Sequence, residues 1–464
     1  MHAPTAIFTA LSLSVALAAS EAVADVTISS DATANMTCSG GVCTPTATDA
    51  VLNVGDLETL LASGDVTVTT TGSGEQADNI DVTANFDWSS DSGLTLDAYQ
   101  AITFTALLTD GGTGNMALVT NDGGSGGTLS FLAGASLSFA NLTGALTVNG
   151  LKYKLVDSIE GLNRAILAKP HGAFALIKDI DAGHRVYRSV PVPVVLNGSF
   201  VGLGHVISHL DISDSSDEYV GFFYELAAPG VISSVGLEDV HVQSPYATAV
   251  GSLVGNVESG TVSNSWASGF VRGVGISGGL VGQNVTGTIS DSWSSAKVEG
   301  NYAGGLVGES FGDIESSFAM GNTNASICAG GIAGGAEGTI DNSYATGNEN
   351  ITSDSAFDGG FAGCTNNLAD TGSYSTGKPR TRSNPRTGGF VGSASNENFA
   401  DCYWDTTTSK TTQGVGNGSD SGITGLTTEQ LQSGLPAGFD PTIWAEDTTI
   451  NNGFPYLITN PPRE

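Results

Sequence analysis

Short runs of alternating apolar and polar residues cover the first third of the chain. Examples are residues 65–69 (Asp-Val-Thr-Val-Thr), 79–83 (Asn-Ile-Asp-Val-Thr) and 145–148 (Ala-Leu-Thr-Val), and turns rich in Gly, Asp and Asn separate them. A two-residue period places successive side chains on opposite faces of a strand. The pattern therefore predicts an irregular series of short strands, arranged as solenoid coils, over residues 25–156.

A five-residue phrase repeats through the second half of the chain. It reads Gly-Ser-Leu-Val-Gly at 251, Gly-Gly-Leu-Val-Gly at 278 and 304, Gly-Gly-Ile-Ala-Gly at 330, Gly-Gly-Phe-Ala-Gly at 359 and Gly-Gly-Phe-Val-Gly at 388. An aromatic residue follows each phrase in nearly constant phase: Trp266, Trp293, Phe318, Tyr344, Tyr374 and Tyr403. Two anchor points in fixed phase define a structural repeat.

The length and composition of this repeat restrict the fold. Gly pairs break helices, so arrays of helical repeats are excluded, and the unit is shorter than the roughly 40 residues of a propeller blade. Units of this kind can stack at about 4.8 Å, so that like residues lie over like residues. We predict an all-β fold, a right-handed parallel β-solenoid (β-helix) with short capping helices.

The other segments are assigned around the repeat. Residues 157–169 read as a helix, and a capping box from Thr427 to Gln430 starts a second short helix. Trp444 supplies a bulky group to cover the last coil, whose open edge would otherwise promote aggregation. The predicted order is a signal peptide (1–24), an irregular N-terminal solenoid with a Cys38–Cys43 turn (25–156), a helical connector (157–170), coils that lead into the repeat (171–250), six repeat coils (251–405) and a C-terminal cap (406–464).

The repeated phrases resemble the GLUG motif, named for its Gly-Leu-x-Gly core, of filamentous-haemagglutinin-like adhesins and related bacterial surface proteins. The resemblance covers about residues 250–405, and residues 198–210 resemble the coil that precedes such repeats. It implies an adhesin that is secreted or held on the outer cell surface of a bacterium. It also implies a host-cell, matrix or glycan receptor and an outer-membrane secretion partner.

The N-terminus carries the pattern of an export signal. An apolar run over residues 6–19 is followed by Ala22-Val23-Ala24, a small-x-small cleavage pattern, before Asp25. This predicts a secretory signal peptide, although the preceding residues include no Lys or Arg. The run is too short to span a bilayer, and no later stretch reaches about 18 apolar residues. We therefore expect no membrane-spanning segment in the mature chain.

The five cysteines fit an oxidising, extracytoplasmic setting. Cys38 and Cys43 enclose the turn-forming tetrapeptide Ser-Gly-Gly-Val, so we predict a disulfide that closes a small hairpin, with two free thiols as the alternative. Cys328, Cys364 and Cys402 are an odd set, of which at most two can pair within the chain. The sequence does not choose between these pairings.

The charge of the chain excludes several classes of protein. The 464 residues include 47 Asp and Glu against 15 Lys and Arg, which gives a formal net charge of -32. Such a surface repels phosphate, so we expect no nucleic-acid partner. Charged residues make up only 13% of the chain, too few for a coiled coil or a helical bundle, whereas 40% hydrophobic residues are enough for a core.

The aromatic column is the most prominent candidate for binding. Trp, Phe and Tyr side chains stacked on the outside of a solenoid would form a platform for carbohydrate. The same side chains stacked inside would hold the coils in register. Apolar neighbours favour the core position, namely Val262, Ile289, Ile314 and Ile340.

Acidic residues and histidines suggest a weak metal candidate. Asp211, Asp214, Asp217 and Glu218 fall within eight residues of a predicted loop, and calcium favours such oxygen-rich loops. The segment matches no EF-hand, so a solvated acidic loop is the favoured interpretation, calcium is the alternative, and no other cofactor or metal is expected. His205 and His209 lie on a predicted strand, about 13 Å apart, and cannot share one ion without other ligands.

One loop departs from the acidic balance. Lys378, Arg380, Arg382 and Arg386 place four of the 15 basic residues within nine positions. A basic loop on an acidic rod could bind anionic glycans or a host surface. A solubilising loop that lengthens the repeat is the favoured alternative.

Two function classes remain. The first is a non-catalytic, secreted or surface-associated adhesin or structural rod, which the export signal and the repeat favour, and for which no catalytic residues are predicted. The second is a polysaccharide-acting β-helix enzyme, a lyase or a glycosidase. Hydrolysis needs two carboxylates about 5 to 9.5 Å apart, and no pairing of carboxylates recurs on one face of the coils. We therefore favour the adhesin.

Overall fold

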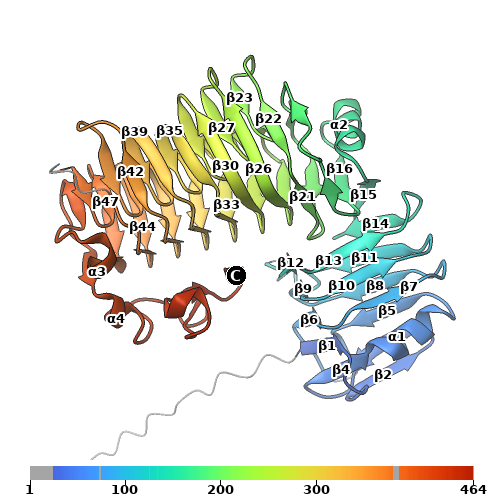
Figure 1. Cartoon of the computed structure of the whole chain (residues 1–464). Helices are drawn as coiled ribbons and strands as arrows, with labels where there is room; N and C mark the ends of the chain where they lie inside the picture. Colours follow the sequence, from blue (N-terminus) through green and yellow to red (C-terminus); the bar gives the residue numbers. More distant parts are fainter. Residues whose placement is uncertain (1–24, 73–74, 125, 133, 380–385, 463–464) are drawn as a thin grey trace, which may run out of the picture.

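The computed structural model describes residues 25–72, 75–124, 126–132, 134–379 and 386–462, so the expected signal peptide lies outside the described residues. The chain winds into a parallel β-solenoid of about 14 turns with few short helices, which confirms the expected all-β solenoid. Figure 1 shows two stacks of coils, here called the first solenoid (residues 25–148) and the second solenoid (residues 151–426). Residues 427–462 are called the C-terminal segment.

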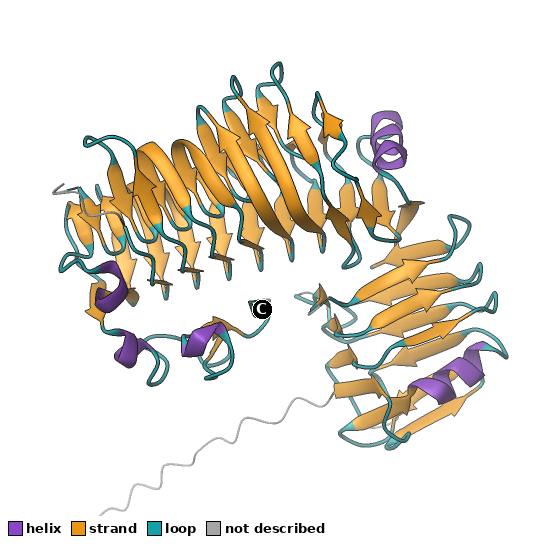
Figure 2. Ribbon diagram, in the orientation of Figure 1, coloured by secondary structure: helices purple, strands orange, loops and turns teal. Residues whose placement is uncertain are grey.

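Three columns of parallel strands build the first solenoid (Figure 2). They are β4 (Ala50–Asn53), β1 (Asp25–Ser29), β6 (Asn79–Val82), β9 (Ile102–Phe104) and β12 (Leu129–Phe131); β7 (Phe86–Trp88), β10 (Leu107–Asp110) and β13 (Ser136–Phe139); and β3 (Val42–Pro45), β5 (Val66–Thr69), β8 (Leu94–Asp97), β11 (Asn115–Val119) and β14 (Ala145–Val148). Helix α1 (Val54–Leu61) begins after Asn53, whose side chain accepts hydrogen bonds from the backbone N–H groups of Gly55 and Asp56. It buries Leu57 and Leu61 against the strands.

The strand direction reverses where the two solenoids meet. Strand β15 (Leu151–Val156) pairs antiparallel with β14 across an Asn149-Gly150 turn in which both residues have positive φ, 49° and 76°. Such Asn-Gly turns fit the twist of an antiparallel hairpin. Strand β15 then pairs in parallel with β16 (Ala173–Leu176), the start of the second solenoid. Helix α2 (Ile159–Ala168), which lies within the segment expected to be helical, connects them.

Two columns of strands line one side of the second solenoid. The strands of the first column begin near the end of the five-residue phrase, and those of the second column follow them in the chain. One consists of β19 (Val192–Leu196), β24 (Phe223–Leu226), β28 (Val254–Val257), β32 (Val281–Asn284), β36 (Val307–Ser310), β40 (Ala333–Asp341), β44 (Ala362–Thr371), β47 (Val391–Ser393) and β50 (Val415–Asn417). The other consists of β16, β20 (Ser199–Val201), β25 (Val231–Ser233), β29 (Thr261–Ser263), β33 (Thr288–Ser290), β37 (Asp313–Glu315), the ends of β40 and β44, and β48 (Asn398–Ala400).

The remaining strands of the second solenoid form one sheet that bends around its other side. One column of this sheet carries the aromatic residues. In pairing order it consists of β17 (Ile180–Asp181), β21 (Val206–Ser208), β26 (Gly236–Ser244), β30 (Trp266–Gly273), β34 (Trp293–Ser294), β38 (Phe318–Ala319), β41 (Tyr344–Ala345), β45 (Tyr374–Ser375), β49 (Cys402–Asp405) and β51 (Ile423–Leu426). The rest comprises β18 (Val186–Tyr187), β22 (Asp211–Ser213), β23 (Tyr219–Val220), β27 (Ala249–Gly251), β31 (Ile276–Gly278), β35 (Lys297–Gly304), β39 (Thr323–Gly330), β42 (Glu349–Ile351), β43 (Phe357–Gly359) and β46 (Thr387–Gly388).

The repeated phrase places an apolar side chain in the core between two close backbone contacts. Its central residue is fully buried in each of the six copies: Leu253, Leu280, Leu306, Ile332, Phe361 and Phe390. A Cβ atom on Gly304 would lie 1.9 Å from the carbonyl oxygen of Val307 and 2.7 Å from the backbone nitrogen of Gly334 in the next coil. The first Gly of the phrase is therefore required because the backbone of its own coil and that of the next coil both approach it closely.

A ladder of serines locks the aromatic column in register. Ser265, Ser292, Ser317, Ser343 and Ser373 precede five of the aromatic residues. The Ser292 hydroxyl donates to the carbonyl of Ser290 (2.7 Å) and accepts from the backbone N–H of Ser265 on the preceding coil (3.2 Å). Ser317 and Ser343 repeat both contacts. On the last coil Cys402 takes the place of the serine, and its thiol donates to the carbonyl of Ala400.

The aromatic column is buried, but on the outside of the solenoid. Ala267 packs in the interior of the second solenoid, whereas Trp266, the preceding residue on the same strand, belongs to a separate apolar cluster. Because successive side chains of a strand point to opposite faces, the small residue fills the interior and the aromatic ring points outward. The favoured placement in the solenoid core is therefore corrected. Parallel rings stack from Trp266 to Tyr374, with centroids 4.7 to 5.6 Å apart.

The C-terminal segment covers this column. This segment comes after α3 (Thr406–Ser409) and β51 in the chain. It includes α4 (Thr428–Leu431), β52 (Trp444–Ala445), the short helix η1 (Asn451–Gly453) and β53 (Tyr456–Leu457). Its apolar side chains in the aromatic cluster are Leu431, Phe439, Trp444, Phe454 and Leu457. The segment returns along the second solenoid, and its end lies between the two solenoids (Figure 1). The cap predicted for the last coil thus runs along the side of several coils.

Two disulfides connect neighbouring strands and coils. Cys38 and Cys43 lie opposite each other in the hairpin of β2 (Met36–Ser39) and β3, and they form the expected disulfide. Cys328 and Cys364, on successive coils, form a second disulfide. Cys402 is free and buried, and burial raises the pKa of its thiol.

None of the helices in the described part of the chain has the length and apolar character needed to cross a bilayer.

Candidate functional site

A groove lies between the side of the second solenoid that carries the aromatic column, helix α3 with the residue after it, and the C-terminal segment. Its volume is about 510 Å³. Hydroxyl and amide side chains make up most of its lining, together with two lysines, one methionine and one phenylalanine. The members are Thr346, Thr376, Thr407, Thr408, Asn348, Asn451, Asn452, Lys378, Lys410, Met320 and Phe454.

Local structure holds the walls of this groove in place. Thr408 is on α3, which begins after Asp405, and its hydroxyl donates to the carbonyl of Thr376 on the neighbouring coil (2.7 Å). Asn451, in η1, donates to the hydroxyl of Tyr374 (2.8 Å). The lining is therefore contributed by secondary-structure elements that hydrogen bonds connect. Lys410 ends α3 in a left-handed conformation with φ of 57°.

The two lysines give the groove a positive charge. Among the described residues, neither Lys378 nor Lys410 has a carboxylate within ion-pair distance. In contrast, Arg272 and Lys297 on the outer face of β30 and β35 both lie beside Glu299, at 3.6 and 2.7 Å. Lys378 and Lys410 are thus available to an anionic ligand.

The predicted basic loop contributes only part of this site. Lys378 lines the groove, whereas the guanidinium of Arg386 donates to the carbonyl of Ser355 and lies 5.0 Å from the ring centroid of Phe357. Arg380 and Arg382 lie outside the described residues. Lys410 was missed because it is 32 residues from Lys378 and outside any local basic cluster. Only the path of the chain after the last coil brings the two together.

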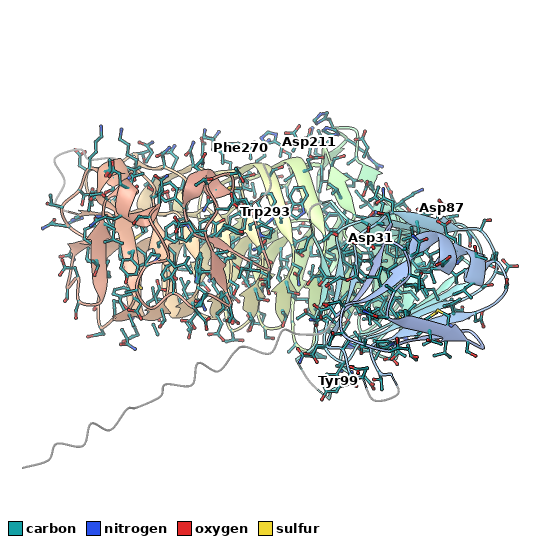
Figure 3. All side chains as sticks on the ribbon, turned by 90° about the horizontal axis from the view of Figure 1, so that it is seen from below. Asp31, Asp87, Tyr99, Asp211, Phe270 and Trp293 are labelled. Atoms are coloured by element: carbon teal, nitrogen blue, oxygen red, sulfur yellow. A yellow bond between two sulfur atoms is a disulfide. The ribbon has the colours of Figure 1, made fainter. Side chains whose placement is uncertain are left out.

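The predicted acidic loop mainly satisfies its own backbone. Asp214 is buried, and its carboxylate accepts from the N–H groups of Ser216 (2.7 Å) and Asp217 (2.9 Å). Asp217 accepts from the N–H of Val190 (3.4 Å). Asp211 faces outward on β22 near Phe270, away from the aromatic column (Figure 3), and Glu218 is exposed. Calcium binding at this loop stays a prediction.

The two histidines of the leading coils have different surroundings. His205 is only 2% exposed, and its ring nitrogens lie 3.0 Å from the carboxylate of Asp179 and 3.0 Å from the carbonyl of Leu137 in the first solenoid. A carboxylate and a carbonyl both accept hydrogen bonds, so a ring nitrogen that carries a proton donates to the partner beside it. The pKa of Asp179 is lowered, mainly by the hydrogen bond from His205. His205 thus joins the two solenoids, and His209 lies at an exposed corner.

Comparison with known families identifies the repeat of this chain. The family defined by the GLUG motif matches residues 325–352, which include the phrase at 330 and Tyr344. No curated protein matches the chain. One solved structure, of a Bacteroides ovatus protein described as a candidate immunoglobulin A1 protease, is 21% identical over 66% of this chain and 93% of that chain, with a TM-score of 0.44.

The GLUG match agrees with the repeat phrase and, with the solenoid fold, fits a surface or secreted protein. A wider likeness to filamentous haemagglutinins is not confirmed, and the likeness to the Bacteroides ovatus protein assigns no activity to this chain.

Proposed function

We propose that this protein is a non-catalytic, adhesin-like binding protein that a bacterium secretes or displays on its outer surface. An outer-membrane secretion partner would export it. Its receptor would be a glycan of a host cell or matrix that carries carboxylate or sulfate groups. The second solenoid would act as a rigid scaffold, and the groove that contains Lys378 and Lys410 would hold the glycan.

The observation that carries this proposal is the lining of the groove. Hydroxyl and amide groups match the hydroxyls of a sugar, and Met320 offers apolar surface to a sugar ring. Lys378 and Lys410 supply the positive charge for an acidic group. The net charge of -32 over the whole chain would disfavour a polyanion that bound without such a local site.

Binding to sulfated and uronate-containing polysaccharides tests the proposal. Residues 25–464 would be purified and titrated with immobilised heparin, hyaluronan and neutral dextran. We expect retention on the acidic polymers that weakens as salt rises, because salt screens exposed charges. Replacing both lysines, Lys378→Ala with Lys410→Ala, should weaken binding at least about tenfold, which corresponds to about 1.4 kcal/mol.

A matched control removes the same charge elsewhere. Arg272→Ala with Lys297→Ala also deletes two positive charges, but from the outer face of β30 and β35, and should retain binding. Equal binding by the Lys378/Lys410 variant would contradict the groove as the site. Release of reducing sugar or unsaturated uronate would instead favour the alternative class, a polysaccharide lyase or glycosidase.

A further inference from the structure

Three successive coils place His184, His209 and Asp239 at one corner of the second solenoid. The backbone N–H of His184 donates to the carbonyl of His209 (2.9 Å), and the N–H of His209 donates to the carbonyl of Glu238 (3.0 Å). All three residues have positive φ, at 56°, 52° and 49°. Residues other than glycine adopt this conformation uncommonly. Here three of them share it at equivalent positions of adjacent coils, so their side chains leave the backbone in the same direction.

The side chains converge at distances that suit a shared ion. Each of the three residues offers one ligand atom, and these atoms lie within 4.8 Å of one another. The imidazole rings are 4.9 Å apart between centroids and tilted by 49°, so they are not stacked face to face. The side chains of His184 and His209 are 62% and 40% exposed, which leaves the corner open to an ion from solution.

A carboxylate outside the cluster orients His209. The Nδ1 atom of His209 lies 2.9 Å from a carboxylate oxygen of Asp181. A carboxylate only accepts, so Nδ1 carries the proton, and Nε2 of the neutral ring keeps a free lone pair. This is the arrangement that orients a metal-binding histidine. The Nδ1 atom of His184 lies 3.7 Å from Asp211, which adds negative charge beside the cluster.

We propose that His184, His209 and Asp239 form a binding site for a divalent transition-metal ion. Two imidazole nitrogens and one carboxylate oxygen suit zinc, which takes such mixed ligands and accepts solvent as a fourth. Calcium prefers sites made wholly of oxygen, so this corner differs in kind from the acidic loop at residues 211–218. Asp181 is a positioning residue, because it acts through His209. The site does not depend on the proposed glycan groove.

Titration with zinc alone tests the site. Tag-free protein covering residues 25–464 would be titrated with ZnCl₂ by isothermal calorimetry, and we expect one ion per chain. His184→Asn with His209→Asn should abolish this binding, since asparagine tolerates positive φ but supplies no imidazole. Asp181→Asn should weaken it about 10- to 100-fold, as other losses of a group that orients a ligand do. His171→Asn, at an exposed histidine outside the cluster, should change nothing.

A spectrum distinguishes the site from adventitious binding. Cobalt(II) bound at two imidazoles and a carboxylate should show visible ligand-field bands that zinc removes and calcium does not. Circular dichroism of each variant would establish that it is folded. Absence of stoichiometric zinc binding by the wild type, unchanged affinity in the double variant, or displacement of the cobalt by calcium would each overturn the proposal.

Discussion

Glu349 offers a sharp test of how the interior of the second solenoid is built. It lies in a column of interior positions that β22, β26, β30, β35, β39 and β42 form in register. The column reads Ile212, Val242, Val271, Val298, Thr323 and Glu349. Glu349 is 3% exposed, and burial, followed by the nearby Asp358, raises the pKa of its carboxyl well above the usual value.

The substitution Glu349→Gln removes this ionisable group and keeps its size. A raised pKa means that the folded state holds the proton while the unfolded state releases it. The contribution of Glu349 to stability is therefore complete below the ordinary glutamate pKa and is lost as the pH rises through the folded pKa. The slope is at most about 1.4 kcal/mol per pH unit for one proton, so the loss between pH 5 and pH 7 is at most about 2.7 kcal/mol.

Chemical denaturation followed by circular dichroism at pH 5 and pH 7 measures this difference. We expect the wild type to lose stability between the two pH values and the Glu349→Gln variant to lose less, by up to about 2.7 kcal/mol. Asp370, another buried carboxyl with a raised pKa, would maintain part of the slope in both proteins. Glu315→Gln, at an exposed position on β37, serves as the control. Identical pH dependence in wild type and the Glu349→Gln variant would refute a buried, protonated glutamate.

Two further substitutions test the packing of the coils and of the C-terminal segment. Trp444 is 1% exposed, its ring centroid lies 5.8 Å from that of Tyr374, and its indole N–H donates to Asn342 (3.3 Å). Trp444→Ala should lower the free energy of unfolding by about 3 to 5 kcal/mol and speed proteolysis within residues 427–462. An unchanged rate of proteolysis would contradict the packing of Trp444 on the column. Gly304→Ala would place a Cβ atom 1.9 Å from the carbonyl oxygen of Val307 in the same coil and 2.7 Å from the backbone nitrogen of Gly334 in the next coil. It should lower the melting temperature measured by differential scanning calorimetry, and an unchanged melting temperature would contradict the need for glycine at this position.

Most of the second solenoid could be predicted from the sequence, because residues with a specific structural role recur at a regular spacing in it. The Gly pairs allow coils to approach, and the apolar residue between them fills the interior. The GLUG phrase and the aromatic residue therefore place the coils without knowledge of distant contacts. The first solenoid shows only the strand period, so its pairings could not be read from the sequence.

The direction of the aromatic column could not be predicted from the same pattern. Pairs such as Trp266-Ala267 and Phe318-Ala319 place one residue on each face, and hydrophobicity alone favours the larger ring for the interior. The structure reverses this, because residues 427–462 bury the rings from outside and the alanines fit the interior. That outcome depends on a segment distant in sequence.

The candidate sites show the same limit. His184 and His209 are 25 residues apart, and Lys378 and Lys410 are 32 apart, so each pair meets only through the stacking of coils or the path that leaves them. The charge of Lys378 was visible in the sequence, but its partner was not. Asp370 likewise follows Val262, Ile289, Ile314 and Ile340 in one interior column, where the repeat predicts an apolar residue.

A single incubation tests the proposed function most directly. The purified protein would be mixed with a panel of acidic and neutral polysaccharides, and bound protein and released sugar would be measured in the same samples. The account predicts retention on acidic polysaccharides, lost in the Lys378→Ala/Lys410→Ala variant, with no reducing sugar or unsaturated uronate released. Product release by the wild type, or retention that both lysine substitutions leave unchanged, would contradict it.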